Sequence, residues 1–497
     1  MAKRQTSDNK LGILAKGQNV MYFKPKEYDA IVVGAGYGGM ISGAILARNG
    51  LKTVIVDPSD QVGGKTGAVN YNGYWLDMGL KDARDTADFI MVMSLPDLYG
   101  QQAAKAAGAE ITMVPVGQMR CHVYPSGEVA DLDMQSEQAI VDYLMQATGV
   151  PVDGIAQFGA LLGSLATLDP LKYQKVILKD WLKENVADGE MHTYLYRYLL
   201  QLFARPPEKA SVGRISEMFH SSGLTFRAND PEVGGMQGFI EPYARVVRKH
   251  KGEVMLGQTP TEILVKDGKV QGVVIADKSG SIQELHAPVV IFSWVVWHIL
   301  DLLDEGLLPK NLVKNARELE RDYNLDTLAV NMGLSRVPTV RATGKPDDWN
   351  GSQRVVVGPD RDYGGIWLLS SLATPTTAPP GKHLLTFLYC SGGKVDDKHP
   401  PFKSFSQAKE EILATTIACA RDYYSDLDEI TEWTSFHYHK QGGVLGWGFS
   451  PVERAPVKCP TIEGLYFVGS STEVSGVVQD HDAHSALIAT SMVLNTR

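Results

Sequence analysis

The amino-acid sequence predicts an α/β protein whose main sheet is assembled from separate stretches of the chain. Three features support this prediction: a strand, glycine-rich turn and helix within residues 28–50, a glycine-opened helix and a hairpin within residues 234–276, and a strand that closes on a glycine within residues 464–469. A strand that runs through glycine into a helix is the repeating unit of α/β folds. The 497 residues are enough for two or three domains.

The first stretch predicts a βαβ unit. Its first strand is Ile31–Val33, and its apolar helix covers Met40–Arg48, where Asn49-Gly50 is a typical helix end. Its second strand, residues 51–56, leads directly into Asp57. An acidic residue about 20 residues beyond the glycine turn is expected to accept hydrogen bonds from a ribose diol. Asp57 is therefore a candidate cofactor-binding residue.

A G-x-G-x-x-G turn, residues 34–39, joins the first strand to the helix. Gly34 makes the tight turn, Gly36 lets the backbone approach a pyrophosphate, and Gly39 lets the helix pack closely on its strand. Gly38 lies in the same turn. The free N–H groups and the positive dipole end of the helix N-terminus then face the phosphates. In this context the turn predicts a bound dinucleotide.

A second glycine pair lies just beyond Asp57, in the run Gly63-Gly64-Lys65-Thr66. It lets another backbone segment approach the diphosphate, with Lys65 as a counter-charge. Turns that bind nicotinamide cofactors usually lack this addition, so the pair favours FAD.

These motifs resemble the FAD fingerprint of the amine oxidase and phytoene desaturase superfamily. The resemblance covers nearly the whole chain after about residue 28, and the same residues also occur in relatives that perform no redox chemistry. It implies FAD as cofactor, a Rossmann-like (GR2-type) FAD-binding domain, and a discontinuous, mixed α+β substrate-binding domain. The boundaries that we draw are 1–27 for an N-terminal extension, 28–80, 231–303 and 455–497 for the FAD-binding domain, and 81–230 and 304–454 for the substrate-binding domain.

The middle stretch resembles the second FAD-domain segment of phytoene desaturases. A glycine-rich turn opens a helix over residues 239–250, strands follow at 253–256 and 261–265, and Asp267-Gly268 is a typical hairpin turn. In the family, the strand before this hairpin flanks the adenine. Pro260 stands there in place of the usual valine, so the resemblance makes it a cofactor contact.

The C-terminal stretch supplies a third FAD segment. The strand within residues 464–469 leads through residues 470–476 into a helix that reaches about Leu494. In the family, this turn holds the ribityl chain, and the helix N-terminus faces the pyrimidine edge of the flavin, where a helix dipole stabilises the negative charge of the reduced ring. The resemblance thereby assigns cofactor contacts to Gly469, Ser470, Gly476, Val477 and Val478.

Two regions are candidates for contact with the flavin ring. The run Tyr74–Gly79 resembles the family's aspartate-x-glycine turn beside the ring, which implies that Gly79 and Leu80 approach it. Lys81 is a candidate catalytic charge, with a solvated surface lysine as the alternative. The run Gly446-Trp447-Gly448-Phe449 is the best candidate for a substrate contact, although core packing is the ordinary role of such aromatic side chains.

Residues 477–484 depart from the family, whose desaturases carry small, Gly/Pro-rich residues here. Asp480 or His481 at the helix entrance could transfer a proton while the flavin takes hydride. Asp480 could instead cap the helix, with His484 paired to it one turn later. A metal site is the third reading, but the flavin should occupy that space, and we predict no metal.

Composition limits the partners and the compartment. With 48 basic and 57 acidic residues and a pI near 5.8, the chain lacks the basic footprint of a nucleic-acid-binding protein. Four separated cysteines without a C-x-x-C pair are typical of reduced thiols. No secretory h-region precedes residue 27, and no run of about 18 apolar residues predicts a membrane span. We expect a cytoplasmic protein, with peripheral membrane contact and homo- or hetero-oligomers left open.

The expected activity is that of a FAD-dependent desaturase or dehydrogenase. It would remove hydride and a proton from a C–C pair of a mainly apolar isoprenoid or alicyclic substrate, with the protein orienting the C–H bond and excluding water. Oxygen, a quinone or another carrier would accept the electrons. The alternatives are isomerisation or saturation at the same site, amine oxidation, and a non-catalytic lipid-binding chaperone of the GDP dissociation inhibitor type.

Overall fold

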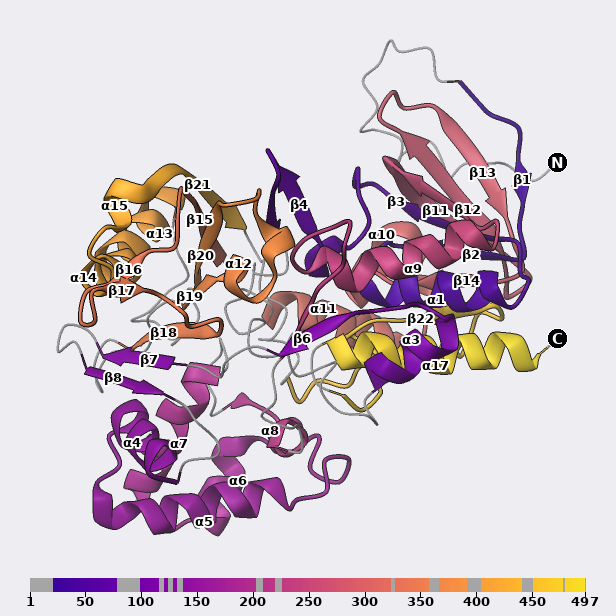
Figure 1. Cartoon of the computed structure of the whole chain (residues 1–497). Helices are drawn as coiled ribbons and strands as arrows, with labels where there is room; N and C mark the ends of the chain where they lie inside the picture. Colours follow the sequence, from indigo (N-terminus) through magenta and orange to yellow (C-terminus); the bar gives the residue numbers. More distant parts are fainter. Residues whose placement is uncertain are drawn as a thin grey trace.

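The computed structural model divides into a nucleotide-binding part, a part built on a large mixed, mostly antiparallel sheet, and a helical lobe (Figure 1). The nucleotide-binding part lies at the right of the figure and the other two lie at the left. The structure describes residues 21–77, 99–115, 120–123, 128–131, 137–202, 209–219, 226–322, 327–356, 366–390, 404–439, 450–476 and 479–496.

A five-stranded parallel sheet forms the centre of the nucleotide-binding part. Its strands come from three distant stretches of the chain, as expected for a Rossmann-like domain. Side chains alternate between its faces: Ile31 and Val33 enter one buried cluster, and Val32 enters the other. In spatial order the strands are β10 (Glu253–Leu256), β3 (Thr53–Asp57), β2 (Ala30–Val33), β14 (Val290–Phe292) and β22 (Leu465–Phe467).

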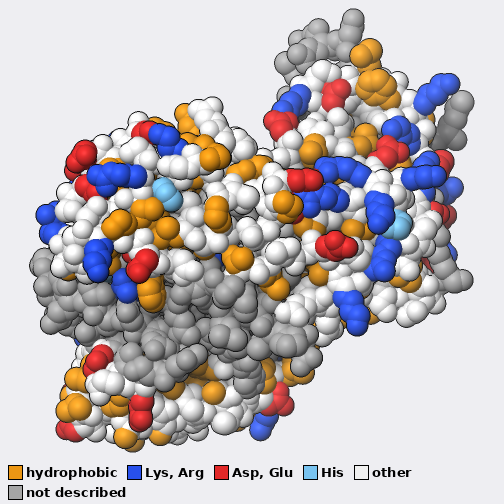
Figure 2. All heavy atoms as spheres, viewed as in Figure 1, with side chains coloured by type: hydrophobic (Ala, Val, Ile, Leu, Met, Phe, Trp, Pro, Cys, Tyr) orange, Lys and Arg blue, Asp and Glu red, His pale blue; other side chains and the backbone are white. Residues whose placement is uncertain are grey.

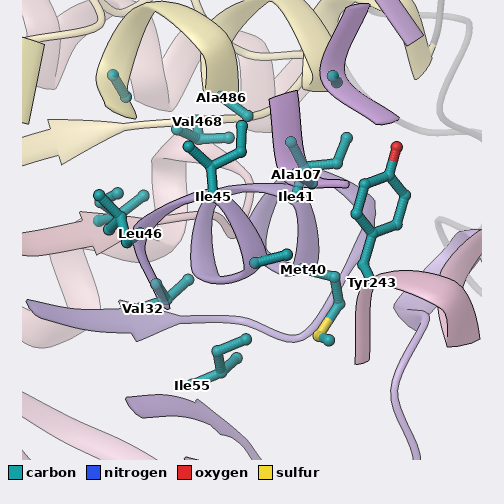
Figure 3. Packing of buried hydrophobic residues seen from close by; sticks show 14 of the residues in the cluster. Val32, Met40, Ile41, Ile45, Leu46, Ile55, Ala107, Tyr243, Val468 and Ala486 are labelled. Carbon is teal, nitrogen blue, oxygen red and sulfur yellow. The ribbon is translucent and has the colours of Figure 1, made fainter. Parts of the chain in front are cut away.

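Helix α1 packs against this sheet and against three further helices. Its residues 37–47 are all buried, which explains why the helix is apolar on every side. Figure 3 shows Ile45 beside Val468 and Ala486 on one side, while Val32 and Ile55 lie on the sheet side. The helices of this face are α1 (Tyr37–Arg48), α3 (Tyr99–Ala107), α9 (Gln237–Lys249) and α17 (Gln479–Asn495).

A four-stranded sheet covers the other face. Its hairpin turns at Asp267 and Gly268, with φ of 52° and 72°, the conformation that such two-residue turns require. The N-terminal stretch lies along its edge, where Tyr22 bridges Ile282 and β1 pairs with β13. The strands are β1 (Lys26–Glu27), β13 (Ile282–His286), β12 (Lys269–Asp277) and β11 (Gln258–Lys266).

A seven-stranded sheet forms the second part, and helices cover one of its faces. Trp367, Phe387 and Tyr424 are the largest side chains of its core. In order, its strands are β21 (Thr431–His439), β15 (Thr327–Leu334), β20 (His383–Cys390), β19 (Ile366–Leu369), β18 (Ser352–Val356), β7 (Arg120–Val123) and β8 (Glu128–Asp131). Its helices are α12 (Ser370–Ala373), α13 (Phe405–Ile412), α14 (Ala418–Tyr423) and α15 (Leu427–Ile430).

The helical lobe has a core of its own, in which Phe158, Leu195 and Ile215 are fully buried. It comprises α4 (Glu137–Thr148), α5 (Ile155–Ala166), α6 (Leu178–Asn185), α7 (Gly189–Leu202) and α8 (Val212–Phe219). Outside the larger sheets, the strands form short pairs: β4 (Ala68–Tyr71) with β5 (Tyr74–Asp77), β6 (Met113–Pro115) with β9 (Phe226–Ala228), and β16 (Thr339–Val340) with β17 (Lys345–Pro346).

Two helices pack differently from the domain boundaries drawn on the sequence. Helix α3 and helix α11 (Lys310–Asp322) fall within the ranges 81–230 and 304–454, which we assigned to the substrate-binding domain. Ala103 and Ala107 of α3 pack against α1, and Leu312 of α11 packs into the cluster on the other face of the parallel sheet. Both helices are amphipathic, and an amphipathic sequence does not indicate which sheet the apolar side of its helix covers.

Surface and thiol properties complete the description. Figure 2 shows acidic and basic side chains interspersed on the visible face. Cys419 and Cys459 are buried free thiols, and burial raises the pKa of Cys419 to about 12. Of the helices in the described residues, none is both long enough and apolar enough to cross a membrane.

Candidate cofactor site

A cavity of about 460 Å³ opens at the carboxyl ends of the parallel strands, where open α/β sheets bind their ligands. The loops after β2, β3, β14 and β22 all contribute to its walls. Its lining comprises Gly36, Tyr37 and Gly38 after β2, Asp57, Pro58, Ser59 and residues 63–66 after β3, Ser293, Trp294, Val295 and His298 after β14, and Gly469, Ser470, Ser471 and Asp482 from the C-terminal stretch.

The glycine-rich turn has the geometry that a diphosphate cradle requires. Gly34 adopts φ of 109°, and a Cβ at Gly39 would lie 2.0 Å from the Gly34 carbonyl oxygen. A Cβ at Gly38 would lie 2.7 Å from Cγ1 of Val468, so Gly38 lets α1 approach the C-terminal strand. A Cβ at Gly36 would meet no described atom within 4 Å, so this glycine faces open space. The helix begins at that point without a side-chain cap, which leaves its N–H donors to the cavity.

The second glycine pair packs against the first turn. The Gly63 N–H donates to the Ala35 carbonyl oxygen at 2.8 Å, and Gly63 bridges Gly36. Gly63 and Gly64 adopt φ of 120° and 53°, and a Cβ at Gly64 would lie 3.3 Å from the Gly36 Cα. Lys65 follows in a 3-10 turn with Thr66 and adds a cation to the wall.

Asp57 is held by backbone groups on both sides. Its Oδ2 accepts a hydrogen bond from the Ala35 N–H and its Oδ1 accepts one from the Ser59 N–H, each at 2.8 Å. A carboxylate oxygen has a second lone pair, so the carboxylate can still accept from two hydroxyls. Asp57 therefore presents a fixed acceptor pair at one end of the cavity.

The C-terminal turn closes the other end. Gly469 adopts φ of 119°, and its N–H donates to Ser485 Oγ of α17 at 2.9 Å. Ser471 Oγ accepts from the Val296 N–H at 3.1 Å, which ties this turn to the loop after β14. Asp482, in the first turn of α17, lines the cavity between these loops.

Several lining residues were absent from the sequence prediction. Ser293, Trp294, Val295 and His298 follow β14 directly, and the rule that ligands bind beyond the carboxyl ends of parallel strands would have indicated them. Asp482 lies two residues beyond Asp480, which we chose instead. Residues two positions apart on an α-helix are separated by about 200° around its axis, so the side chains of Asp480 and Asp482 point in nearly opposite directions.

Asp480 does not line this cavity. Its Oδ1 accepts from the Gly100 N–H at 3.1 Å. Burial raises the pKa of Asp480 to about 7, although backbone N–H groups act in the opposite direction. Gly476 lies directly beside it, because a Cβ there would be 2.9 Å from the His481 nitrogen.

His481 lies in a buried cluster of cations. Its Nε2 is 2.8 Å from Arg454 Nη1 and 3.1 Å from Arg214 Nη1. Guanidinium groups only donate, so this nitrogen accepts, and the ring carries its proton on Nδ1. Burial, together with the charge of Arg214, lowers the pKa of Arg454 well below its usual value. Arg214 also pairs with Glu217 at 2.7 Å.

The other predicted residues either lie away from the cavity or fall outside the described residues. Pro260 is buried in β11 and does not line the cavity. The described residues contain no group of three or more His, Cys, Asp or Glu side chains that could hold a metal. Gly79, Leu80, Lys81, Trp447, Phe449, Val477 and Val478 lie outside the described residues, and their roles stay predictions.

The cavity has the features that FAD requires. Helix N–H donors and an open space at Gly36 suit the diphosphate, Lys65 suits its charge, and Asp57 suits a ribose. The fold and this site define a protein that binds a dinucleotide in a Rossmann-like domain.

The family model of flavin containing amine oxidoreductases matches residues 37–483. The chain belongs to this family, and FAD is its cofactor. This family is part of the superfamily that includes amine oxidases and carotenoid desaturases.

Individual relatives are distant. Phytoene desaturase (neurosporene-forming) of Rhodobacter capsulatus is 24% identical over 360 residues, which span 66% of this chain and 63% of the relative, less than two thirds of its length. Prolycopene isomerase of Daucus carota is 20% identical and is matched over 81% of this chain and 68% of its own. The crystal structure of an oxidoreductase from Methanosarcina mazei is similar with a TM-score of 0.64, at 16% identity, over 94% of this chain and all of that one.

Proposed function

We propose that this FAD-dependent oxidoreductase removes hydride and a proton from a C–C bond of a mainly apolar isoprenoid substrate. The observation that carries the proposal is a cavity whose described walls suit the diphosphate and ribose of FAD, in a chain that is similar over 66% of its length to a phytoene desaturase. An alicyclic substrate of similar polarity would use the same chemistry.

The described residues would act mainly by holding the cofactor. When bound, FAD supplies the hydride acceptor. The turn at Gly36 and the N-terminus of α1 would bind the diphosphate, Asp57 would bind the ribose, and Lys65 would offset negative charge. The part built on the seven-stranded sheet would orient the substrate and exclude water.

Asp480 stays a prediction for proton transfer, although its side chain does not line the cofactor cavity. A carboxyl group whose pKa is raised to about 7 is suited to general acid or base chemistry at neutral pH. His481 Nε2 already accepts from two guanidinium groups, so only a rearrangement would let it take a proton there. Lys81 stays a third candidate.

A redox-neutral isomerisation is the second candidate function. The observation that favours it is the similarity to prolycopene isomerase over 81% of this chain. Saturation by reduced flavin would use the same site. Amine oxidation ranks below both because a probable flavin-containing monoamine oxidase of Dictyostelium discoideum is matched over only 45% of this chain, against 66% for the phytoene desaturase. A non-catalytic lipid-binding role would not need the glycine turns and Asp57 that line the cofactor cavity.

Anaerobic bleaching of the flavin tests the proposal. The purified protein, loaded with FAD, would be mixed with isoprenoid polyenes, alicyclic acids and amines, and absorbance of the oxidised flavin would be followed. Bleaching by a polyene, with a product that has one more conjugated double bond, is expected. A product with an unchanged number of double bonds would establish isomerisation instead. Bleaching by amines alone, with peroxide formed on admission of air, would overturn the proposal.

Re-oxidation of the bleached protein identifies the electron acceptor. Oxygen, a soluble quinone and a one-electron carrier would be added separately to the reduced enzyme. The acceptor that restores the oxidised spectrum fastest at equal concentration would be assigned to the reaction.

A further inference from the structure

An acidic side chain lines the cavity that receives the negatively charged diphosphate. Asp482 lies in the first turn of α17, and its partly buried side chain forms part of the same wall as Gly36, Gly64 and Ser470. An acidic residue is unexpected there, because like charges at short distance repel most strongly where water is excluded.

The neighbouring atoms place the Asp482 Cβ beside Gly38 of the first glycine turn and its carboxyl beside Gly469 of the C-terminal turn. A Cβ at Gly38 would lie 3.4 Å from the Asp482 Cβ, and a Cβ at Gly469 would lie 3.5 Å from Asp482 Oδ1. The Ser470 N–H donates to this carboxyl. The group therefore lies between the turn that binds the diphosphate and the C-terminal turn.

The protonation state decides whether this side chain opposes or supports the cofactor. An ionised carboxylate only accepts hydrogen bonds, whereas a neutral carboxyl also donates one O–H. Burial raises the pKa of Asp482 to about 7, although the Ser470 N–H and the charge of Lys65 act in the opposite direction. A nearby diphosphate would raise this pKa further, because like charges favour the neutral form.

The other charged groups at this wall come from several elements. Lys65 approaches from the 3-10 turn, Tyr37 lines the wall from α1, and Asp57 and His298 line the rest of the cavity. On α17 itself, the ionisable neighbours have other contacts. They are Asp480 with Gly100, His481 with Arg214 and Arg454, and His484 with Ser475.

We propose that Asp482 binds the FAD diphosphate as a neutral carboxyl that donates a hydrogen bond, and that cofactor binding takes up one proton at this side chain. FAD affinity then falls as the pH rises, because the free protein must first protonate Asp482. Above pH 7 the Kd for FAD rises about tenfold per pH unit. This coupling concerns FAD alone and holds whichever substrate the enzyme uses.

Equilibrium binding of FAD to the apoprotein tests the proposal. Flavin fluorescence would give the Kd at pH 6, 7, 8 and 9, and calorimetry at pH 8 in two buffers with different ionisation enthalpies would count protons. For the native protein we expect a Kd that rises about tenfold per unit above pH 7 and an uptake close to one proton. Asp482→Asn keeps an N–H donor without titrating, so its Kd should be independent of pH and lower than that of the native protein at pH 9.

Two control variants identify the titrating group. His298→Gln and Asp480→Asn should keep the native slope, and loss of the slope in either one would assign the proton elsewhere and overturn the proposal. A native Kd without pH dependence or proton uptake would overturn it as well. Asp482→Asn that binds FAD more weakly at every pH would show an ionised carboxylate accepting from the cofactor. The proton count on the native protein decides the matter even if that variant fails to fold.

Discussion

The nucleotide-binding part and the part built on the seven-stranded sheet differ in how their sequences encode structure. In the first, backbone groups approach one another and the cavity, so glycine is required at fixed positions: a Cβ at Gly39 would lie 2.0 Å from a carbonyl oxygen. In the second, side chains such as Trp367 and Phe387 fill an apolar core, and many apolar sequences can do so. A motif therefore indicates the cofactor, and no comparable motif indicates the substrate.

The largest expected effect comes from breaking a buried ion pair between β5 and β9, two short strands outside the seven-stranded sheet. Arg227 Nη2 lies 2.5 Å from Asp77 Oδ2, and Asp77 Oδ1 accepts from the Met236 N–H at 2.7 Å. Arg227→Met would leave a buried carboxylate without its cation. The free energy of unfolding, measured in urea, should fall by about 3–5 kcal/mol.

An exposed pair provides the control for that measurement. Lys278 and Asp60 form an ion pair at 2.6 Å with side chains 69% and 78% exposed. Lys278→Met should change the free energy of unfolding by less than about 1 kcal/mol. Equal losses in the two variants would contradict the view that burial sets the cost of breaking the Arg227–Asp77 pair.

Alanine substitutions at Gly39 and Gly36 separate the role of the glycine turn in packing from its role in binding FAD. Gly39→Ala forces a Cβ against the Gly34 carbonyl oxygen and should lower the free energy of unfolding by about 1–3 kcal/mol or more. Gly36→Ala meets no described atom, so the apoprotein should keep its stability while FAD binding weakens roughly 100-fold. Denaturant unfolding of both apoproteins and flavin fluorescence titrations would measure this, and equal stability losses would contradict the assignment.

Much of the nucleotide-binding part could be predicted from the sequence because backbone constraints leave local signals. Gly34, Gly63 and Gly469 all adopt positive φ, a backbone conformation that residues other than glycine rarely adopt. The Asp267-Gly268 turn was predictable for the same reason. Packing partners leave no such signal, so the positions of α3 and α11 emerged only from the structure.

The next largest effect is expected at Asp57, the proposed hydrogen-bond acceptor for the ribose. Asp57→Asn removes the charge from an acceptor that we expect to bind two hydroxyls. Because hydrogen bonds to charged groups contribute about 1.5–3 kcal/mol, the Kd for FAD should rise roughly 10- to 100-fold. Asp60→Asn, three residues further along and exposed, should leave the Kd unchanged. A matched loss in both variants would remove Asp57 from the site.

The sequence did not predict which residue in the first turn of α17 faces the cavity. We predicted Asp480 and His481 at the flavin, but the residue of this turn that lines the cavity is Asp482. The sequence does not show which residue begins the helix, and each one-residue shift rotates every side chain by about 100°. Trp294 and His298 carry no motif, and only their place after a parallel strand would have indicated them.

The smallest predicted effect concerns Asp480 and pH. Its folded-state pKa is raised from 3.8 to about 7, so the folded protein binds the proton more tightly than the unfolded chain. The stabilisation that comes from the tighter proton binding at Asp480 is complete below pH 3.8 and is lost as the pH rises to about 7. Asp480→Asn should remove this loss and raise the melting temperature at pH 8 by roughly 1–4 °C. No difference between pH 4 and pH 8 in the effect of the substitution would contradict the raised pKa.

The central claim is that distant stretches of this chain form one FAD site, and the visible spectrum of the purified, FAD-reconstituted protein tests it most directly. We predict the absorption bands of bound oxidised flavin, with one FAD per chain retained through gel filtration in the native protein and lost in Gly36→Ala. A native protein that stays colourless after reconstitution would contradict the claim.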